Sequence, residues 1–192
     1  MSSPPDQTII DFLIYSPQKT GSTSLAMILK QSPDIRTIKN GIPLEPMFFH
    51  EKIYTGSVTI GDYNNLFDIA ESKNVLYFEK STQYFETHIA LSQIIKYCKS
   101  NLKYIVVLRN PVDRFISEYI HFKSLSNIIN NNPAYLDKLS YEEGWRGDWQ
   151  ASKKHKFFIE YPNINDMLKS TNRGLSCGLY HIHISRLLES VD

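Results

Sequence analysis

The sequence predicts an α/β domain with a mainly parallel central sheet. Three short apolar runs, at residues 9–15 (IIDFLIY), 75–78 (VLYF) and 104–108 (YIVVL), alternate with segments of helical periodicity. Strands that alternate with helices are typical of βαβ units, whose strands run parallel. The runs are short and continuous, as expected for strands covered on both faces. The sequence therefore favours a sheet with helices on both sides.

The helices are predicted from apolar residues at helical spacing. After the first strand we expect a helix carrying Leu25, Ile28 and Leu29, with Ser22, Thr23 or Ser24 as a possible cap. The next helix has the stripe Leu91, Ile94, Ile95 and Cys98. Pro111 opens a third helix, whose predicted inward face is Val112, Phe115, Ile116 and Tyr119. A last helix starts near Gly178, with one stripe formed by Tyr180, Ile184, Leu187, Leu188 and Val191. Residues 124–171 show only irregular or short-helical patterns.

Length and charge narrow the possible functions. The 192 residues fit a single domain, and 21 basic against 20 acidic side chains give a net charge of +1. Such a balance provides no global field for nucleic acid or an anionic membrane, so a local cluster must hold any anionic ligand. Residues 1–7 are too polar for a secretory signal, and no apolar run is long enough for a membrane segment in this chain. Cys98 and Cys177 form no metal-binding pattern.

The loop at residues 16–24 (SPQKTGSTS) has the composition of an anion cradle. It joins a predicted strand to a helix, at the end of the sheet where ligands of α/β domains bind. A helix N-terminus offers backbone amides, a glycine permits close approach, and a lysine adds charge. The pattern lacks the first glycine of a Walker loop, and an ordinary strand-to-helix turn remains the alternative. The candidate phosphate- or sulfate-binding residues are Lys19, Thr20, Gly21, Ser22, Thr23 and Ser24.

A second candidate site starts at the end of the third predicted strand. Arg109 can form a forked contact with a phosphate, and Ser117, two turns into the following helix, can donate its hydroxyl to the same group. Arg114 and Glu118 have the spacing of an ion pair within a helix. Taken alone, Ser117 is better explained as a small surface hydroxyl.

Together, residues 18–23 (QKTGST) and 108–114 (LRNPVDR), with Ser117, resemble the two nucleotide-binding signatures of sulfotransferases that use 3′-phosphoadenosine 5′-phosphosulfate (PAPS). In that family the first signature holds the 5′-phosphosulfate and the second holds the 3′-phosphate. The resemblance implies a three-layer, P-loop-NTPase-like sulfotransferase fold with a central parallel sheet. It also implies PAPS as the co-substrate and no metal.

Two more segments resemble the heparan sulfate (glycosaminoglycan) sulfotransferases, and within them the N-sulfotransferase domain. In residues 45–49 (EPMFF), Glu45 matches the family's catalytic base, and residues 77–85 (YFEKSTQYF) match its substrate cleft. The resemblance extends over about residues 9–188 and implies that Lys19, Lys80 and His121 assist at the reacting centre. A surface lysine and a helix-face histidine remain the alternatives for Lys80 and His121.

We therefore expect a sulfotransferase that transfers the sulfuryl group from PAPS to an amine or hydroxyl of a glycosaminoglycan-like acceptor. A carboxylate such as Glu45 suits this chemistry, because the acceptor must lose a proton as it attacks sulfur. The alternative is a non-catalytic module that binds PAP, PAPS or a glycan on the same fold. A metal-dependent nucleotide kinase is disfavoured, because the strand that ends at Arg109 supplies no magnesium-binding acid.

The family resemblance also bears on extent and location. The resembling enzymes continue past the helix that ends near Leu188, so residues 1–192 are expected to be one sulfotransferase domain without the family's C-terminal portion. Resemblance implies the Golgi lumen, and the cytoplasm is the alternative. The expected partners are PAPS or PAP and a carbohydrate, not nucleic acid. The basic run at 153–156 (KKHK) could contact an acidic glycan or be a solvated loop, and His181 and His183 are not expected to share a metal.

Overall fold

The computed structural model describes residues 7–40, 44–49, 58–70, 74–131 and 177–191. The chain divides into two compact units. The first comprises Met1–Leu108 and His181–Asp192, and the second comprises Arg109–Tyr180. The first unit contains the sheet, and the second contains the long helix α4, Pro111–Asn131.

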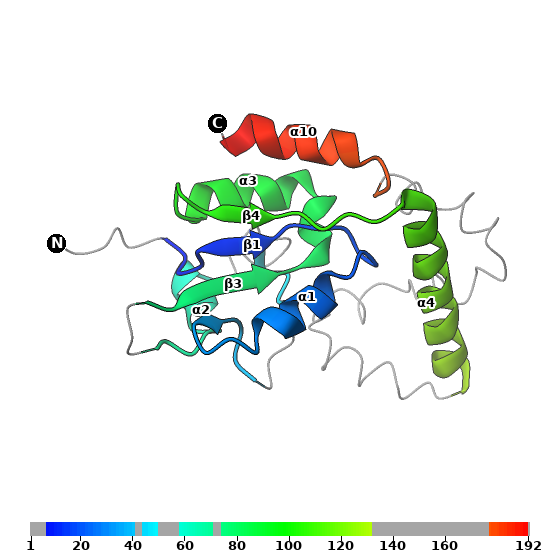
Figure 1. Cartoon of the computed structure of the whole chain (residues 1–192), viewed down its shortest axis with the longest axis horizontal. Coiled ribbons are helices and arrows are strands. Elements are labelled where there is room, and N and C mark those ends of the chain that lie inside the picture. The colour runs from blue at the N-terminus through cyan, green and yellow to red at the C-terminus, as the bar shows by residue number, and fades with distance from the viewer. Residues whose placement is uncertain (1–6, 41–43, 50–57, 71–73, 132–176, 192) are drawn as a thin grey trace. The chain divides into compact units, whose positions relative to one another are not determined.

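A four-stranded parallel sheet forms the centre of the first unit (Figure 1). Its strands are β1 (Phe12–Ile14), β2 (Ile35–Arg36), β3 (Leu76–Lys80) and β4 (Lys103–Ile105), in the spatial order β2-β3-β1-β4. Ile14 pairs in register with Lys80 on one side and with Ile105 on the other, so three strands end level. The predicted parallel sheet is confirmed, whereas the two-residue strand β2 was not predicted.

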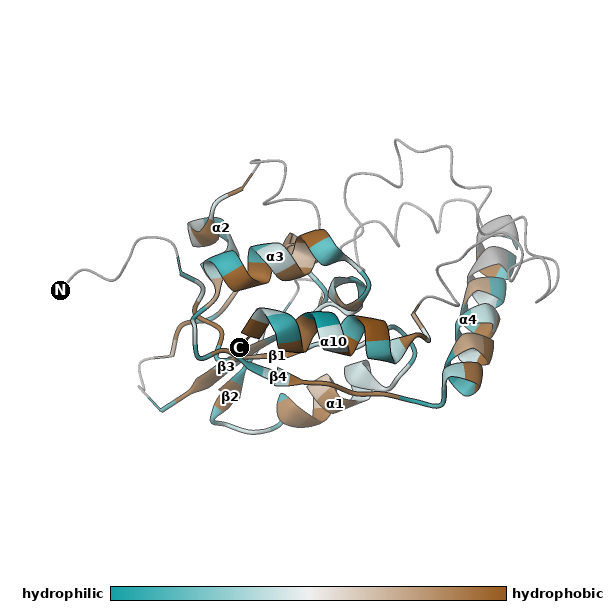
Figure 2. Cartoon of the chain, turned by 90° about the horizontal axis from the view of Figure 1, so that it is seen from above, coloured by the Kyte–Doolittle hydropathy of each residue, from teal (hydrophilic) through white to brown (hydrophobic). Residues whose placement is uncertain are grey.

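Helices cover both faces of this sheet. The helix α1 (Ser22–Leu29) lies on one face, and α2 (Ile60–Asn64) and α3 (His88–Tyr97) lie on the other (Figure 2). The chain crosses from β1 to β2 in one direction and returns through β3 to β4 in the other, so right-handed crossovers place the helices on opposite faces. A 3₁₀ helix, η2 (Thr82–Phe85), follows β3, and α10 spans Tyr180–Val191. The three-layer arrangement is therefore confirmed.

The core follows from the alternation of side chains along the strands. Phe12, Ile14 and Phe78 pack with Ala26 beneath α1. On the opposite face, Tyr15 packs against Phe85. A buried aromatic cluster lies beside it on that face, and its members are Phe48, Phe49, Tyr63, Phe67 and Tyr84.

Parts of the predicted helix faces are wrong. On α4, Val112 and Ile116 are exposed, and the buried positions include Phe115, Phe122 and the ion-paired Arg114 and Glu118. A paired Arg and Glu can take inward positions that apolar periodicity assigns to other residues, and the predicted ion pair itself is confirmed. Ile95, Leu188 and Val191 are also exposed, and His183 and Leu187 form the buried side of α10. Residues 124–131 continue the long helix α4, where irregular or short-helical structure was predicted, and most of the rest of that region lies outside the described residues.

Candidate active site

The loop after β1 bends sharply before α1 begins. Lys19 and Gly21 both have positive φ angles, 68° and 99°. Gly21 is the N-cap residue, and its carbonyl accepts the first helical hydrogen bond from the Leu25 N–H at 3.1 Å. The Thr20 hydroxyl donates to the Pro17 carbonyl at 2.9 Å and closes the loop on itself. The prediction that Ser22, Thr23 or Ser24 caps the helix is wrong, because these residues form its first turn.

The N-terminus of α1 is open to a ligand. The N-cap residue Gly21 has no side chain that could cap the first turn, and a Cβ added to it would meet no atom within 4 Å. Thr23 and Ser24 are exposed beside it. An uncapped first turn with space at its glycine fits a phosphate or sulfate group, because free amides and the helix dipole attract an anion there.

The start of α4 in the second unit is different, because Asn110 already occupies its amides. The Asn110 Oδ1 atom accepts the Val112 N–H at 3.0 Å and the Asp113 N–H at 3.3 Å, which is side-chain capping. An anion near this end must therefore depend on side chains. Arg109 directly precedes the cap, and its carbonyl accepts the Tyr180 hydroxyl at 2.7 Å. Ser117 and His121 lie further along the same helix, both half-buried.

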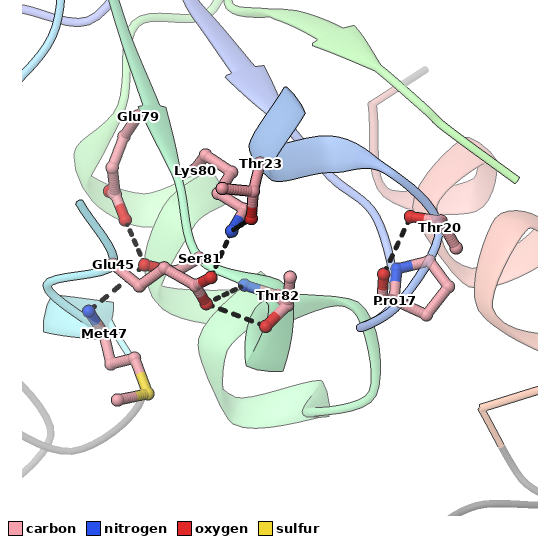
Figure 3. A network of polar contacts seen from close by, with 9 residues as sticks. All are labelled: Pro17, Thr20, Thr23, Glu45, Met47, Glu79, Lys80, Ser81 and Thr82. Carbon is pink, nitrogen blue, oxygen red and sulfur yellow. Dashed lines mark hydrogen bonds and ion pairs between the residues drawn. The ribbon is translucent and has the colours of Figure 1, made fainter. Parts of the chain in front are cut away.

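Lys80 links the loop region to the predicted base. It is the last residue of β3, and its side chain is only 1% exposed. Its Nζ donates to the Thr23 Oγ1 at 2.7 Å and forms an ion pair with the Glu45 carboxylate (Figure 3). The alternative of a surface lysine is wrong. The structure thus brings together three residues that lie far apart in the sequence.

Glu45 is held through both carboxylate oxygens. Oε1 faces Lys80, whereas Oε2 accepts the backbone N–H of Thr82 at 3.1 Å and its hydroxyl at 2.8 Å. The Glu45 side chain is 27% exposed, so it is oriented by these bonds while still reachable from solvent. A fixed, partly accessible carboxylate is the arrangement that a general base requires.

A third group, Glu79, was not predicted as a site residue. It is fully buried, and its carboxylate accepts hydrogen bonds from the Tyr63 and Ser81 hydroxyls, each at 2.6 Å. Burial raises the pKa of Glu79, and these hydroxyl contacts oppose the rise. One signal was present in the sequence: a strand expected to be covered on both faces continues directly into Glu79 and Lys80, so both charges should be buried.

The two histidines of α10 were not expected to share a metal ion, and they point in different directions. His181 is exposed, whereas His183 is buried with its ring 4.8 Å from the Phe85 ring, so the two do not share a face. Residues 153–156 lie outside the described residues. None of the helices in the described ranges combines the length and apolar character needed to cross a membrane.

Comparisons with known proteins agree with this arrangement. The human bifunctional heparan sulfate N-deacetylase/N-sulfotransferase 1 is 29% identical over 182 residues, which are 93% of this chain and 18% of that protein. Mouse heparan sulfate glucosamine 3-O-sulfotransferase 3B1 is 33% identical over 107 residues, which are 56% of this chain and 25% of that protein. The chain therefore spans only about a fifth of the first of these relatives.

A solved structure shows the same fold. The crystal structure of a sulfotransferase from Alicyclobacillus acidocaldarius superposes with a TM-score of 0.55 at 23% identity, covering 95% of this chain and 69% of that one. The family model for the sulfotransferase domain matches residues 10–191. A match over nearly the whole chain, on a fold that the solved structure shares, establishes that this chain belongs to the sulfotransferase domain family.

Proposed function

We propose that the protein transfers the sulfuryl group of PAPS to an amine or hydroxyl of a glycosaminoglycan-like sugar. The observation that carries this proposal is the position of the buried Lys80 ammonium. Its Nζ atom contacts both Thr23, in the first turn of α1, and the Glu45 carboxylate. One cation thus adjoins both the proposed donor-binding loop and the proposed base.

The uncapped N-terminus of α1 supports the proposed donor site. Lys19 and the first-turn residues Ser22, Thr23 and Ser24 would hold the 5′-phosphosulfate, because this helix end offers amides and hydroxyls next to open space at Gly21. Arg109 and Ser117 of the second unit are proposed to hold the 3′-phosphate. Since Asn110 already caps α4, that phosphate would depend on these side chains rather than on helix amides.

The proposed reaction requires a proton acceptor and a charge stabiliser. The acceptor nitrogen or oxygen forms a bond to sulfur, the bond from sulfur to the 5′-phosphate oxygen breaks, and the acceptor proton passes to the Glu45 carboxylate. Negative charge then develops on the released oxygen. Lys19, Lys80 and the α1 amides would stabilise that charge, with His121 assisting. For Lys80 this means leaving its ion pair with Glu45, which also frees Oε1 to take the proton.

The proposed chemical class of the sulfate acceptor is inferred from the names of the related proteins. Their names specify N-sulfotransferase activity for one and 3-O-sulfotransferase activity for another, both on heparan sulfate. Both nitrogen and oxygen acceptors are therefore proposed. A compartment in the secretory pathway, the Golgi lumen, is proposed on the same basis, and imaging of the tagged full-length protein would test it.

The test of the function is transfer of radiolabelled sulfate from PAPS to two glycans. One is N-desulfated and offers free amines, and the other is N-acetylated and offers only hydroxyls. We expect transfer to at least one of them. Glu45→Gln should lower kcat by about 10²- to 10⁴-fold, because the amide cannot accept the proton.

Glu189→Gln is the matched control, since it makes the same chemical change at an exposed position of α10. Its activity should equal that of the wild type. Full activity in Glu45→Gln would refute the assigned base. PAP binding without transfer to any acceptor would instead favour a non-catalytic binding module.

A further inference from the structure

Glu45 itself lies outside any helix or strand, and hydroxyl groups bond the backbone that follows it. The Met47 N–H donates to the Ser81 Oγ at 3.1 Å, and the Phe49 N–H donates to the Tyr84 hydroxyl at 3.2 Å. Met47, two residues after Glu45, has a φ of 47°. A positive φ is unfavourable for a residue with a side chain, so this backbone persists only where its surroundings hold it.

One of these hydroxyls also donates to Glu79. The Ser81 hydroxyl donates to Oε1 at 2.6 Å, and the Tyr84 phenol lies near enough for the Glu79 charge to raise its pKa. Tyr63 of α2 donates to Oε2 at 2.6 Å. Within the described part of the chain, the partners of Glu79 are thus hydroxyl groups and not a cation.

A carboxylate in this position determines which way the hydroxyls point. Each hydroxyl has one hydrogen and two lone pairs, and an ionised carboxylate can only accept. When Ser81 directs its hydrogen to Glu79, its lone pairs remain for the N–H group of Met47. Burial and the Glu79 carboxylate hold the pKa of Tyr63 and Tyr84 well above the ordinary value, so both phenols keep their protons.

We propose that Glu79 is a positioning residue for the catalytic base. Its carboxylate orients the Ser81 hydroxyl onto the Met47 N–H of the Glu45 segment, and this holds the Glu45 carboxylate against Lys80 and Thr82 (Figure 3). The role assigned to Glu45 rests on the proposed function, whereas the anchoring of the segment does not. Because Glu79 is fully buried, no contact with the donor or the acceptor is proposed for it.

Glu79→Gln tests this role, because it keeps the shape of the side chain and adds a donor that competes for the hydroxyl lone pairs. We expect kcat to fall by about 10²-fold, the effect of a misplaced catalytic group, while KM for PAPS changes less than about threefold. Ser81→Ala, which removes the acceptor for the Met47 amide, should have the same effect. Glu189→Gln again serves as the matched control.

Whether Glu79 affects activity through Glu45 is tested by combining Glu79→Gln with Glu45→Gln. If Glu79 acts through Glu45, adding Glu79→Gln there should cause no further loss of activity. An equal loss in both backgrounds would refute the positioning role and indicate general destabilisation. Unchanged kcat in both Glu79→Gln and Ser81→Ala would refute it as well.

Amide hydrogen exchange gives a readout that needs no activity. Glu79→Gln should accelerate exchange of the Met47 and Phe49 amides at least about tenfold and leave the β1 amides unchanged, as expected for a local release. Unchanged protection at Met47 and Phe49 would overturn the proposal. If the wild type transfers no sulfate but these two amides respond, the proposed function fails and the anchoring by Glu79 stands.

Discussion

Glu79 illustrates how a single buried residue can act against stability. Its carboxylate is surrounded by Tyr63 from α2, Tyr84 and Ser81 after β3, and the nearby charge of Glu45. Desolvation raises its pKa above the usual 4.5, and the charge of Glu45 adds to the rise. Ionisation of Glu79 is therefore harder in the folded protein than in the unfolded chain. A group retained at such a cost is more readily explained by function than by folding.

This gives a pH dependence of stability with a definite sign. Because the folded pKa of Glu79 lies above 4.5, the unfolded chain loses this proton first as the pH rises. The contribution of Glu79 to the free energy of unfolding is then complete below about pH 4.5 and decreases until the folded-state pKa is passed. The stability of Glu79→Gln relative to the wild type should therefore increase with pH over this range. Urea denaturation of both proteins at several pH values measures it, and a constant difference would contradict the expectation.

The sequence predicts the residues of the site unevenly. Lys80 and Glu45 were identified through the family resemblance, and the structure brings their side chains together. Ser81 and Thr82 lie in the segment assigned to the substrate cleft, but neither was given a role, because a hydroxyl gives no signal until its neighbours in space are known. Glu79 gave a partial signal, since it continues an apolar strand. The sequence could not reveal that hydroxyl groups of Ser81 and, from α2, Tyr63 donate to its carboxylate.

Among the elements, α1 is the one whose beginning determines the proposed chemistry. Its N-cap is Gly21 at φ 99°, and Gly21 faces open space. Another of the chain's eight glycines, Gly61, lies inside α2, where an added Cβ would meet only the Thr59 Oγ1 at 3.4 Å. The same substitution at the two positions should therefore have opposite effects.

Gly21→Ala should lower the free energy of unfolding by about 1–2 kcal/mol, because a residue with a Cβ disfavours the left-handed region. Gly61→Ala should raise it by up to about 1 kcal/mol, because alanine is the better helix residue. Thermal and urea denaturation compare the two variants. The Cβ at position 21 should also weaken nucleotide binding, whereas Gly61→Ala should leave it unchanged. Equal stability changes in the two variants would contradict the assigned backbone conformation.

The elements themselves were predictable where apolar residues dominate. The strands β1, β3 and β4 and the helices α1, α3, α4 and α10 were all anticipated, with boundaries that differ by a few residues. The short strand β2 was missed, because two half-buried residues carry no periodicity. The inward face of α4 was misassigned in part, since the buried Arg114–Glu118 pair looks like a surface pair in the sequence.

At the scale of the whole molecule, both units carry residues proposed to bind the nucleotide. Lys19 belongs to the first unit and Arg109 to the second. A ligand that binds only the folded chain stabilises it, by about 2.7 kcal/mol at 100 times Kd. Adding 3′-phosphoadenosine 5′-phosphate should therefore raise the Tm in a concentration-dependent manner.

Adenosine 5′-monophosphate provides the control for this measurement, because it lacks the 3′-phosphate. It should give a smaller shift, and Arg109→Ala should reduce the difference between the two nucleotides. The absence of any shift with 3′-phosphoadenosine 5′-phosphate would count against the proposed donor and against a nucleotide-binding module alike.

The order of the strands was only partly accessible from the sequence. Alternating elements predicted parallel strands, and right-handed crossovers restrict the topologies, yet the placement of β1 between β3 and β4 depends on contacts far apart in the chain. That placement matters, because it sets Lys80 in register with the end of β1, where the loop to α1 begins.

The pairing of β3 with β1 also determines which charge reaches which side of the sheet. Glu79 and Lys80 are adjacent, so their side chains point to opposite faces, toward Tyr63 of α2 and Thr23 of α1. A slip of one residue would exchange them. The ammonium would then lie among hydroxyl groups, and a carboxylate would face the proposed sulfate-binding loop and repel its anion. Strand register would therefore determine the charge selectivity of the proposed site, and inserting or deleting one residue within Leu76–Lys80 should reverse its polarity.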